Sequence, residues 1–322
     1  IITLVVFGVI LVDVGPRAEV LMHDYEEGSF VEQEFGLEGF DRIYISNSHK
    51  AIITPGSEYR IMVRGRASEI DRLDIEVDPS QLQISNKAAE GFCLFCFNRG
   101  LEFEISMPEL TEVKAGGASE FSVKGFSPDT LRLLLSGASR GDVDSDSSRI
   151  ISELSGASWL SLSGSSTALS AEVSGASKLH VQDLDLLDLN LALSGSSRAE
   201  LSGSCQMAAI SASASSKVFA YPLRTDRVRL DASGLSRIEI EALDEIEINA
   251  SGASKVHFRG NPKVIDKSVE SSQVEQFRSQ FPDVREYDFN IENDGPVSGI
   301  YFEAEDIVDT ASKTGYLYAE AS

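Results

Sequence analysis

Four acidic residues between positions 142 and 153 have the spacing of oxygen ligands in a calcium-binding loop. Counted from the first, they occupy positions 1, 3, 5 and 12 of such a loop: Asp142, Asp144, Asp146 and Glu153. Position 6 holds Ser147 where such a loop uses glycine, and no helical pattern flanks the segment. A weak Ca²⁺ site is therefore one interpretation and a solvated acidic loop the other, and no other cofactor is predicted.

A second acidic group lies in the segment VQDLDLLDLNL, which contains Asp183, Asp185 and Asp188. In a strand, Asp183 and Asp185 would share the outward face, because the leucines after each of them would point the other way. Paired carboxylates can hydrolyse glycosidic bonds. However, no basic, histidine or aromatic residue accompanies this group in the sequence, and no Ser-His-Asp motif appears. We therefore predict no enzymatic activity and no catalytic residue, with a polysaccharide-active β-helix enzyme as a second alternative.

Trp159 is the only tryptophan of the chain, and it directly follows a repeated phrase, GAS. An exposed tryptophan there could stack against a sugar ring, which makes Trp159 a candidate glycan contact. Packing of the ring at a corner of the fold is the other interpretation.

Two of the three cysteines, Cys93 and Cys96, form a Cys-x-x-Cys pair inside an apolar run. Such a pair serves redox chemistry or supplies half of a zinc site. Because the sequence has no second pair and no histidine pair nearby, we interpret them as core or strand cysteines that could form a local disulfide. Cys205 replaces the last serine of a repeated LSGSS phrase and is predicted to be a small buried residue.

The composition is that of a folded, strongly acidic protein. Of its 322 residues, 42% are hydrophobic, and the net charge is −23. Nucleic acid as a partner would require a basic stripe, and the sequence has none, so no nucleic-acid partner is predicted. The negative charge also disfavours adsorption of the body of the protein to an anionic membrane.

Residues 1–16 are an apolar segment, IITLVVFGVILVDVGP, and residues 17–28 are a polar, acidic linker. The apolar run is shorter than the ~20 residues of a membrane-spanning helix. We interpret it as the remnant of a signal or anchor, as a docking segment that inserts into a neighbouring subunit, or as a first core element. The first two interpretations place the protein outside the cytoplasm, with membrane contact only through this segment.

Alternation of apolar and polar residues predicts strands through the rest of the chain. Residues 29–112 form an N-terminal β module, and residues 113–262 form a repeat with a period of about 19 residues. The reference position of the repeat is the glycine of S-G-x-S or its replacement: Gly117, Gly137, Gly156, Gly175, Gly195, Ala214, Gly234 and Gly252. With two or more short strands per period and no helical stretch, the pattern predicts an all-β fold, a parallel β-helix or β-solenoid.

The repeated S-G-x-S phrase is interpreted as a structural turn. Glycine permits the positive φ of a sharp corner, and serine hydroxyls can bond the backbone or the equivalent serine one coil away. Ala214 in place of glycine suggests that not every corner requires a positive φ. The repeat stops near residue 262, and residues 263–322 are interpreted as a C-terminal cap or extension, with a short helix expected around residues 272–281.

The order of three features resembles the head GIN domain family of auto-transporter adhesins. These are the entry segment EGFDRIYIS with GSEYRIMVRG and LQISN, the serial S-G-x-S phrase, and the exit SKVHFRGNPKVIDKSVESS. The resemblance covers about three quarters of the chain and implies a secreted or envelope-anchored right-handed β-helix without enzymatic activity. This chain reads S-G-A-S where family repeats often read S-G-S-G-D, and the resemblance does not explain the residues after Ser272.

These observations predict a non-enzymatic β-solenoid at the cell envelope or outside the cell, acting as an adhesin or a surface structural protein. Its expected partner is a cell-surface or matrix component, with carbohydrate as a candidate. The alternative is a homo-oligomer, the subunit of an extracellular filament assembled through the apolar N-terminus and the C-terminal tail.

Overall fold

The computed structural model describes residues 30–87 and 100–276 in full. Outside them it describes only the backbone of four short strands, which form two antiparallel pairs: β1 (Val5–Val6) with β2 (Val9–Ile10), and β24 (Ile300–Glu303) with β25 (Tyr316–Ala319). The contacts divide the chain into residues 1–278 and residues 279–322. The expectations for residues 1–16, for the linker, and for Cys93 and Cys96 therefore lie outside the fully described part.

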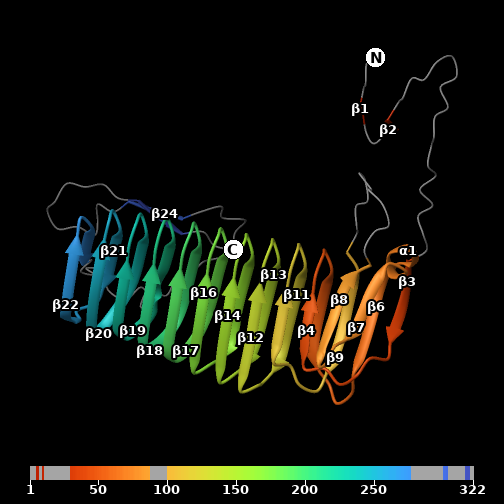
Figure 1. Ribbon diagram of the computed structural model, residues 1–322. Coiled ribbons are helices and arrows are strands. Elements are labelled where there is room, and N and C mark those ends of the chain that lie inside the picture. Colours follow the sequence, from red (N-terminus) through yellow and green to blue (C-terminus); the bar gives the residue numbers. More distant parts are fainter. Residues whose placement is uncertain are drawn as a thin grey trace. The chain divides into compact units, whose positions relative to one another are not determined.

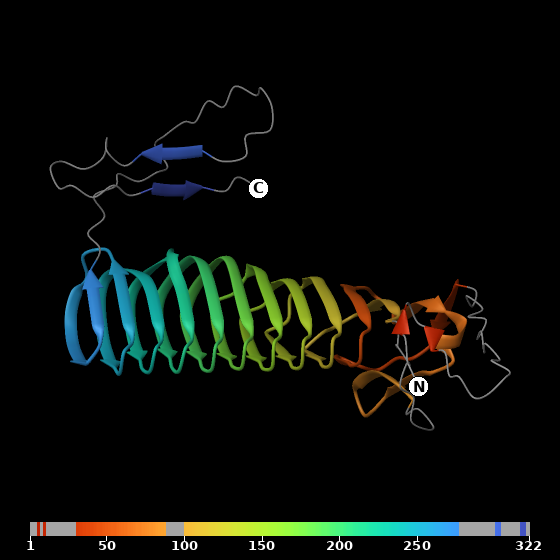
Figure 2. The same ribbon diagram turned by 90° about the horizontal axis from the view of Figure 1, so that it is seen from above.

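The first unit is the predicted β-solenoid, with about nine turns of ~19 residues each (Figures 1 and 2). Each coil has two long sides that meet at the S-G-x-S corner. We call the strands that run into the corner the leading face and the strands that leave it the trailing face. Because consecutive coils pair in parallel and in register, equivalent residues stack about 4.8 Å apart along the solenoid.

The leading face is built from β10 (Glu112–Ala115), β12 (Thr130–Leu135), β14 (Arg149–Leu154) and β16 (Ala168–Val173). The trailing face begins with β11 (Glu120–Phe126), β13 (Arg140–Asp146) and β15 (Trp159–Ser165). Four long strands then contribute to both faces in turn: β17 (Lys178–Leu193), β18 (Arg198–Ala212), β19 (Lys217–Ala232) and β20 (Arg237–Ser251).

The last coil continues past residue 262, through β21 (Lys255–Arg259), β22 (Lys263–Glu270) and β23 (Gln273–Gln276). The helix expected around residues 272–281 is wrong where the structure describes it, because residues 273–276 pair with β21 as a strand. The repeat persists here without its glycine. Ser271 adopts a φ of 56°, and the Oγ of Ser254 donates a hydrogen bond to that of Ser272 at 3.1 Å, continuing the serine column.

In the N-terminal module, the order of the strands along the solenoid differs from their order in the chain. The coil of β4 (Arg42–Ile45) and β5 (Lys50–Pro55) lies between β10–β11 on one side and β8 (Gln81–Asn86) with β9 (Glu102–Met107) on the other. Beyond them, β7 (Leu73–Val77) pairs antiparallel with β8, and β6 (Arg60–Arg66) pairs antiparallel with β9 and with β3 (Phe30–Phe35). These reversed strands cover the edge that parallel stacking would leave open. The only helix described is the single turn α1 (Ala67–Ile70).

His49 joins the inserted coil to its neighbour. Its side chain is 1% exposed, and its Nδ1 accepts a hydrogen bond from the Leu101 backbone N–H at 3.1 Å. The proton must therefore lie on Nε2, which donates to Asn86 Oδ1 at 3.1 Å. Burial lowers the pKa of His49, and the hydrogen bond to Asn86 offsets this only in part. A neutral histidine thus holds β9 against the coil of β4 and β5.

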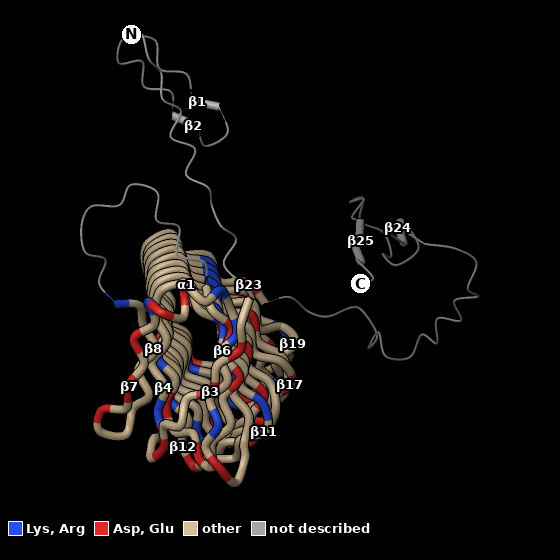
Figure 3. Tube along the Cα trace, turned by 90° about the vertical axis from the view of Figure 1, so that its right-hand side faces the viewer, with Lys and Arg blue, Asp and Glu red and all other residues tan. Residues whose placement is uncertain are grey.

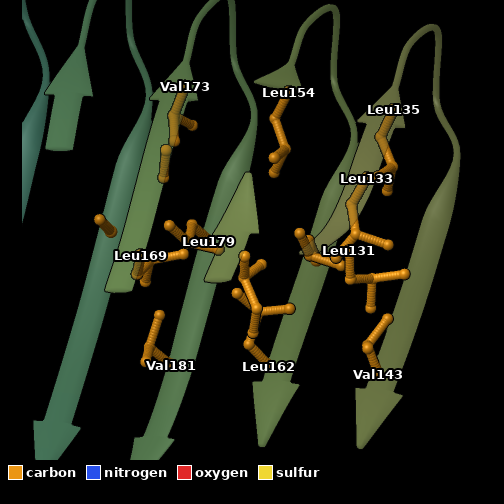
Figure 4. Close-up of a cluster of buried hydrophobic side chains, with 14 of the residues drawn as sticks. Leu131, Leu133, Leu135, Val143, Leu154, Leu162, Leu169, Val173, Leu179 and Val181 are labelled. Atoms are coloured by element: carbon orange, nitrogen blue, oxygen red, sulfur yellow. The ribbon is translucent and has the colours of Figure 1, made fainter. Parts of the chain in front are cut away.

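The core is one column of apolar side chains between the two faces. Alternate residues of most solenoid strands point inward and are almost completely buried, as Leu131, Leu133 and Leu135 are on β12 (Figure 4). Full burial of one such leucine contributes about 1.5–3 kcal/mol. The predicted alternation is therefore confirmed.

The corner glycines have one conformation in every coil. Their φ values lie between 68° and 74°, at Gly117, Gly137, Gly156, Gly175, Gly195, Gly234 and Gly252. The residue after each of them donates its N–H to the carbonyl of the equivalent corner residue one coil earlier, as Ala157 does to Gly137 at 2.7 Å. A Cβ on Gly156 would lie 2.4 Å from that carbonyl oxygen, which is too close for any side chain. At a corner stacked as closely as Gly156, the stacking and the dihedral angle therefore both favour glycine.

Ala214 corrects the expectation that its corner avoids positive φ, because its φ is 57°. The residue after it still stacks, with Ser215 N–H bonded to the Gly195 carbonyl at 2.8 Å. The corners in this half of the solenoid stack less closely, since a Cβ on Gly195 or on Gly234 would stay 2.8 Å from the preceding carbonyl oxygen. Alanine occupies this corner without changing its shape, at the cost of left-handed strain.

The last serine of each phrase points into the solenoid and forms an internal serine column, with each member buried: Ser119, Ser139, Ser158, Ser177, Ser197, Ser216, Ser236 and Ser254. Ser216 Oγ donates to the Ser213 carbonyl at 2.8 Å, and Ser158 Oγ lies 3.2 Å from Ser177 Oγ. The hydroxyls of Ser197 and Ser236 have no hydrogen-bond partner among the described residues. The predicted hydroxyl bonds are therefore present in most coils but not in all.

We predict that Gly156→Ala is more damaging than Gly252→Ala. Both variants place an alanine in the left-handed region, at a cost of about 1–2 kcal/mol. Only at Gly156 would the new methyl approach a backbone oxygen within 2.4 Å, whereas at Gly252 the nearest atoms are 3.1 Å away. Urea unfolding followed by circular dichroism should show a further loss of about 1–3 kcal/mol for Gly156→Ala. Equal losses would contradict the close stacking of the corners.

Ser216→Ala and Ser236→Ala form a second matched pair, one coil apart in the serine column. Ser216→Ala removes a hydrogen bond made inside the fold and should lower the free energy of unfolding by about 0.5–1.5 kcal/mol. Ser236→Ala removes a buried hydroxyl without a partner and should leave stability unchanged or raise it. Thermal unfolding of both variants checks this, and a larger loss for Ser236→Ala would refute it.

Candidate binding surface

The acidic residues of the predicted calcium loop lie in a strand instead of a loop. Asp142, Asp144 and Asp146 alternate along β13 with buried residues and point outward from the trailing face. Glu153 lies on β14, which belongs to the leading face. The turn between the two strands thus separates the fourth residue from the other three. Within the described ranges, no group of three or more His, Cys, Asp or Glu side chains is arranged to hold a metal ion.

Asp183 and Asp185 share the exposed side of β17, as predicted, because Leu184 and Leu186 are buried. Asp183 lies at an irregularity of the sheet with a φ of 51°, and its N–H donates to Ser202 Oγ at 2.9 Å. Ser204 Oγ donates to Asp185 Oδ1 at 2.6 Å. Ser202 Oγ also lies 3.2 Å from Asp183 Oδ1, so each carboxylate accepts a hydrogen bond from a serine of the next coil.

Asp188 starts the leading-face part of β17 and is also exposed. Asp183, Asp185 and Asp188 do not form a group that could hold a metal ion, and the described residues contain no such group of three or more acidic, histidine or cysteine side chains. No hydrogen bond or ion pair joins the described Asp183 and Asp185 to a basic or histidine side chain. Asp183 and Asp185 thus share one exposed side of the strand, but no described side chain that could act as their acid or base partner is bonded to them.

Trp159 opens β15 on the trailing face and is half-buried. The Arg140 guanidinium, one coil earlier in the same position, lies 5.1 Å from the centre of its ring. This is the distance of a cation–π contact. The ring is therefore partly covered by its neighbour, and both predicted roles, packing at the corner and contact with a glycan, remain compatible with its position.

Cys205 is the buried small residue that its place in the phrase predicts, with 3% of its surface exposed. Its Sγ donates to the Met207 carbonyl at 3.1 Å. Burial raises the pKa of the Cys205 thiol to about 11, so the thiol is protonated and unreactive at neutral pH.

A row of cations runs along the trailing face. The first residue after the corner is basic in five consecutive coils that pair in register, and we call this row the basic ladder: Lys178, Arg198, Lys217, Arg237 and Lys255. All five side chains point outward from the core. Figure 3 marks Lys and Arg on the Cα trace in blue. The expectation that the chain has no basic stripe is therefore wrong for this face.

The sequence does not show the ladder as a basic run, because its members are 18 to 20 residues apart in the chain. A sequence signal was present, since Lys or Arg follows most copies of the phrase, as in SGASK and SGSSR. Only the register between coils turns these scattered residues into neighbours.

Two hollows of the surface are lined by residues outside the basic ladder. Near the N-terminal module, a shallow pocket of about 320 Å³ is lined by residues that include Lys50, Arg64 and Asp142. Two of its cations are paired: Lys50 lies 3.3 Å from Glu120, and Arg64 contacts both Glu32 and Glu104, whereas Arg140 lies over the Trp159 ring. On the leading face, a groove of about 510 Å³ is lined by residues that include Glu153 and Glu172. Of the cations that line these two hollows, only Arg140 has no carboxylate partner among the described residues.

Comparisons with known proteins place this geometry in a wider group. Residues 39–200 and 179–262 match a family described as "putative auto-transporter adhesin, head GIN domain". No curated protein matches the chain. The described residues include no helix long and apolar enough to cross a membrane.

Several crystal structures have the same fold. A putative adhesin from Parabacteroides distasonis is 16% identical over 78% of this chain and 98% of that one, with a TM-score of 0.60. A putative lipid binding protein from the same species is 17% identical, over 78% and 97% of the two chains, with a TM-score of 0.58. A putative adhesin from Parabacteroides merdae is 17% identical over the same shares, with a TM-score of 0.57.

At these identities, the likeness to solved structures shows the fold alone. None of the descriptions names an enzyme. The family match extends over well over half of the sequence and includes most of the solenoid. The chain therefore belongs to the family described as "putative auto-transporter adhesin, head GIN domain".

Proposed function

We propose that this protein is a non-enzymatic adhesion module at the cell surface or outside the cell, which binds a surface or matrix component through the outer faces of the solenoid. The observation that carries the proposal is the register between coils, which sets outward side chains in straight columns on a rigid stack. A regular array of side chains suits an extended, repetitive ligand better than a small substrate. Membership of a family named for adhesins supports the same assignment.

The absence of catalysis is part of this proposal. The carboxylates of Asp183 and Asp185 are exposed and accept hydrogen bonds from serines, and no general acid or base side chain is bonded to them among the described residues. The thiol of Cys205 is buried and protonated. These features support a binding protein over a polysaccharide-cleaving enzyme.

We expect no turnover when the protein is incubated with a panel of neutral and acidic polysaccharides and the products are separated by size. Binding to at least one surface or matrix polymer should be detectable with the same preparation. The matched variants are Asp183→Asn and Asp185→Asn, which keep the serine contacts sterically possible. Cleavage by the wild type that disappears in either variant would establish an enzyme and reject the proposal.

A filament subunit is the second candidate function, and the last coil favours it. Within the described part of the chain, β22 pairs only with β20, so its outer edge is open. Val264, Ile265 and Val269 are exposed on it. An open strand edge with apolar residues can pair with another copy. Size-exclusion chromatography and electron microscopy test this candidate, and a discrete monomer at high concentration would exclude it.

A further inference from the structure

The basic ladder is an unusual feature in this protein. The chain has 51 acidic residues against 28 Lys and Arg, so a random surface column would contain more acids than bases. Like charges directly opposite each other on paired strands repel. Five cations at about 4.8 Å intervals therefore work against the stability of the stack. A costly arrangement of this kind is retained where it serves a function.

The equivalent column on the leading face has no such uniform charge. Its residues at the start of each strand are mixed in charge and size: Thr130, Arg149, Ala168, Asp188, Met207, Arg227, Glu245 and Lys263. Here cations and anions occur together along the same stack. The repeat by itself thus does not demand a cation at the start of a strand.

Within the ladder, the arginines and lysines differ in their partners. Arg198 Nε lies 2.6 Å from Glu200, and Arg237 contacts Glu239. Among the described residues, no ion pair holds Lys178, Lys217 or Lys255, and all three are exposed. Free cations therefore recur on every second coil, about 9.6 Å apart. The corner residues that precede the ladder are glycine, alanine, serine or leucine. No charged side chain from these corners therefore lies beside the ladder.

From this geometry, and resting on the adhesion function proposed above, we propose that the ladder binds an extended acidic polysaccharide that lies along the solenoid axis. A spacing of about 9.6 Å between free lysines is on the order of the length of two linked sugar rings. Carboxylates or sulfates on such a polymer can each meet one ammonium group. Several weak contacts on one rigid row then add up to useful affinity.

Nucleic acid fits this face less well. Glu200 and Glu239 occupy the outward column beside the ladder and would repel the dense phosphates of a nucleic acid strand. The aromatic rings nearby are not free for stacking with bases. Arg198 lies 4.3 Å from the Phe219 ring and Arg259 lies 4.0 Å from the Tyr221 ring. A single row of well-separated cations suits a polymer of low charge density.

The test compares two triple variants of the full chain with equal loss of charge. One removes the free lysines of the ladder: Lys178→Gln, Lys217→Gln and Lys255→Gln. The control removes three exposed cations of the leading face: Arg149→Gln, Arg227→Gln and Lys263→Gln. The probes are hyaluronan and polygalacturonate, with neutral dextran, single-stranded oligo-dT and anionic phosphatidylglycerol vesicles for comparison. Circular dichroism confirms that all the proteins fold alike.

Binding is followed by the fluorescence of Trp159, which lies one coil from Lys178 in the same column. We expect the wild type to bind at least one acidic polysaccharide but not dextran, and binding to weaken as salt rises. The ladder variant should bind roughly 100-fold more weakly, since each cation near an anionic surface contributes about a fivefold factor. The control variant should bind as the wild type does.

Equal weakening in both variants would overturn the proposal, because net charge alone would then explain binding. Tighter binding to oligo-dT or to the vesicles would also overturn it and assign the face to nucleic acid or to a lipid surface. A wild type that adheres to a neutral polymer or to cells but binds neither acidic polysaccharide would reject the ladder as the site. That last result would leave the adhesion function itself intact.

Discussion

The stacking of one corner on the next is the constraint on which this structure depends. At each S-G-x-S corner, a backbone N–H donates to a carbonyl of the coil below at 2.6 to 2.8 Å. The contact requires a positive φ at the corner residue, and at the closely stacked corners, such as Gly156, it also leaves no space for a side chain. Glycine meets both conditions. Because every corner repeats the same geometry, the strands on both sides are held in register over the length of the solenoid.

That register governs both the interior and the surface. Inside, it aligns leucine with leucine and serine with serine, which forms a continuous core with a column of hydroxyls beside it. Outside, it converts residues almost 20 positions apart into direct neighbours. The basic ladder and the cation–π pair of Arg140 with Trp159 arise in this way. The binding properties of the surface therefore follow from the period of the repeat as much as from the identity of the residues.

The strands at the two ends of the solenoid are paired differently from those in the middle. At the N-terminal end, antiparallel strands β3, β6 and β7 cover the open edges. At the other end of the described residues, β22 keeps an open edge and exposed valine and isoleucine side chains. A parallel stack has an unpaired strand edge at each end, and the free backbone groups of such an edge can pair with another chain. The two ends thus differ in what they can contact.

The sequence by itself determined the β-solenoid, because alternation with a period of two and a recurring glycine are local signals. It also located the corners, indicated the hydroxyl bonds of the serines, and predicted the burial of Cys205. The tertiary structure decided what depends on contact between coils. It placed β4 and β5 between later strands, gave Ala214 a positive φ, and continued the serine column to Ser272 without a glycine. It also separated Glu153 from Asp142 and lined up the lysines of the ladder. The distances between residues of different coils depend on how the coils pair, and a local sequence pattern does not specify that pairing.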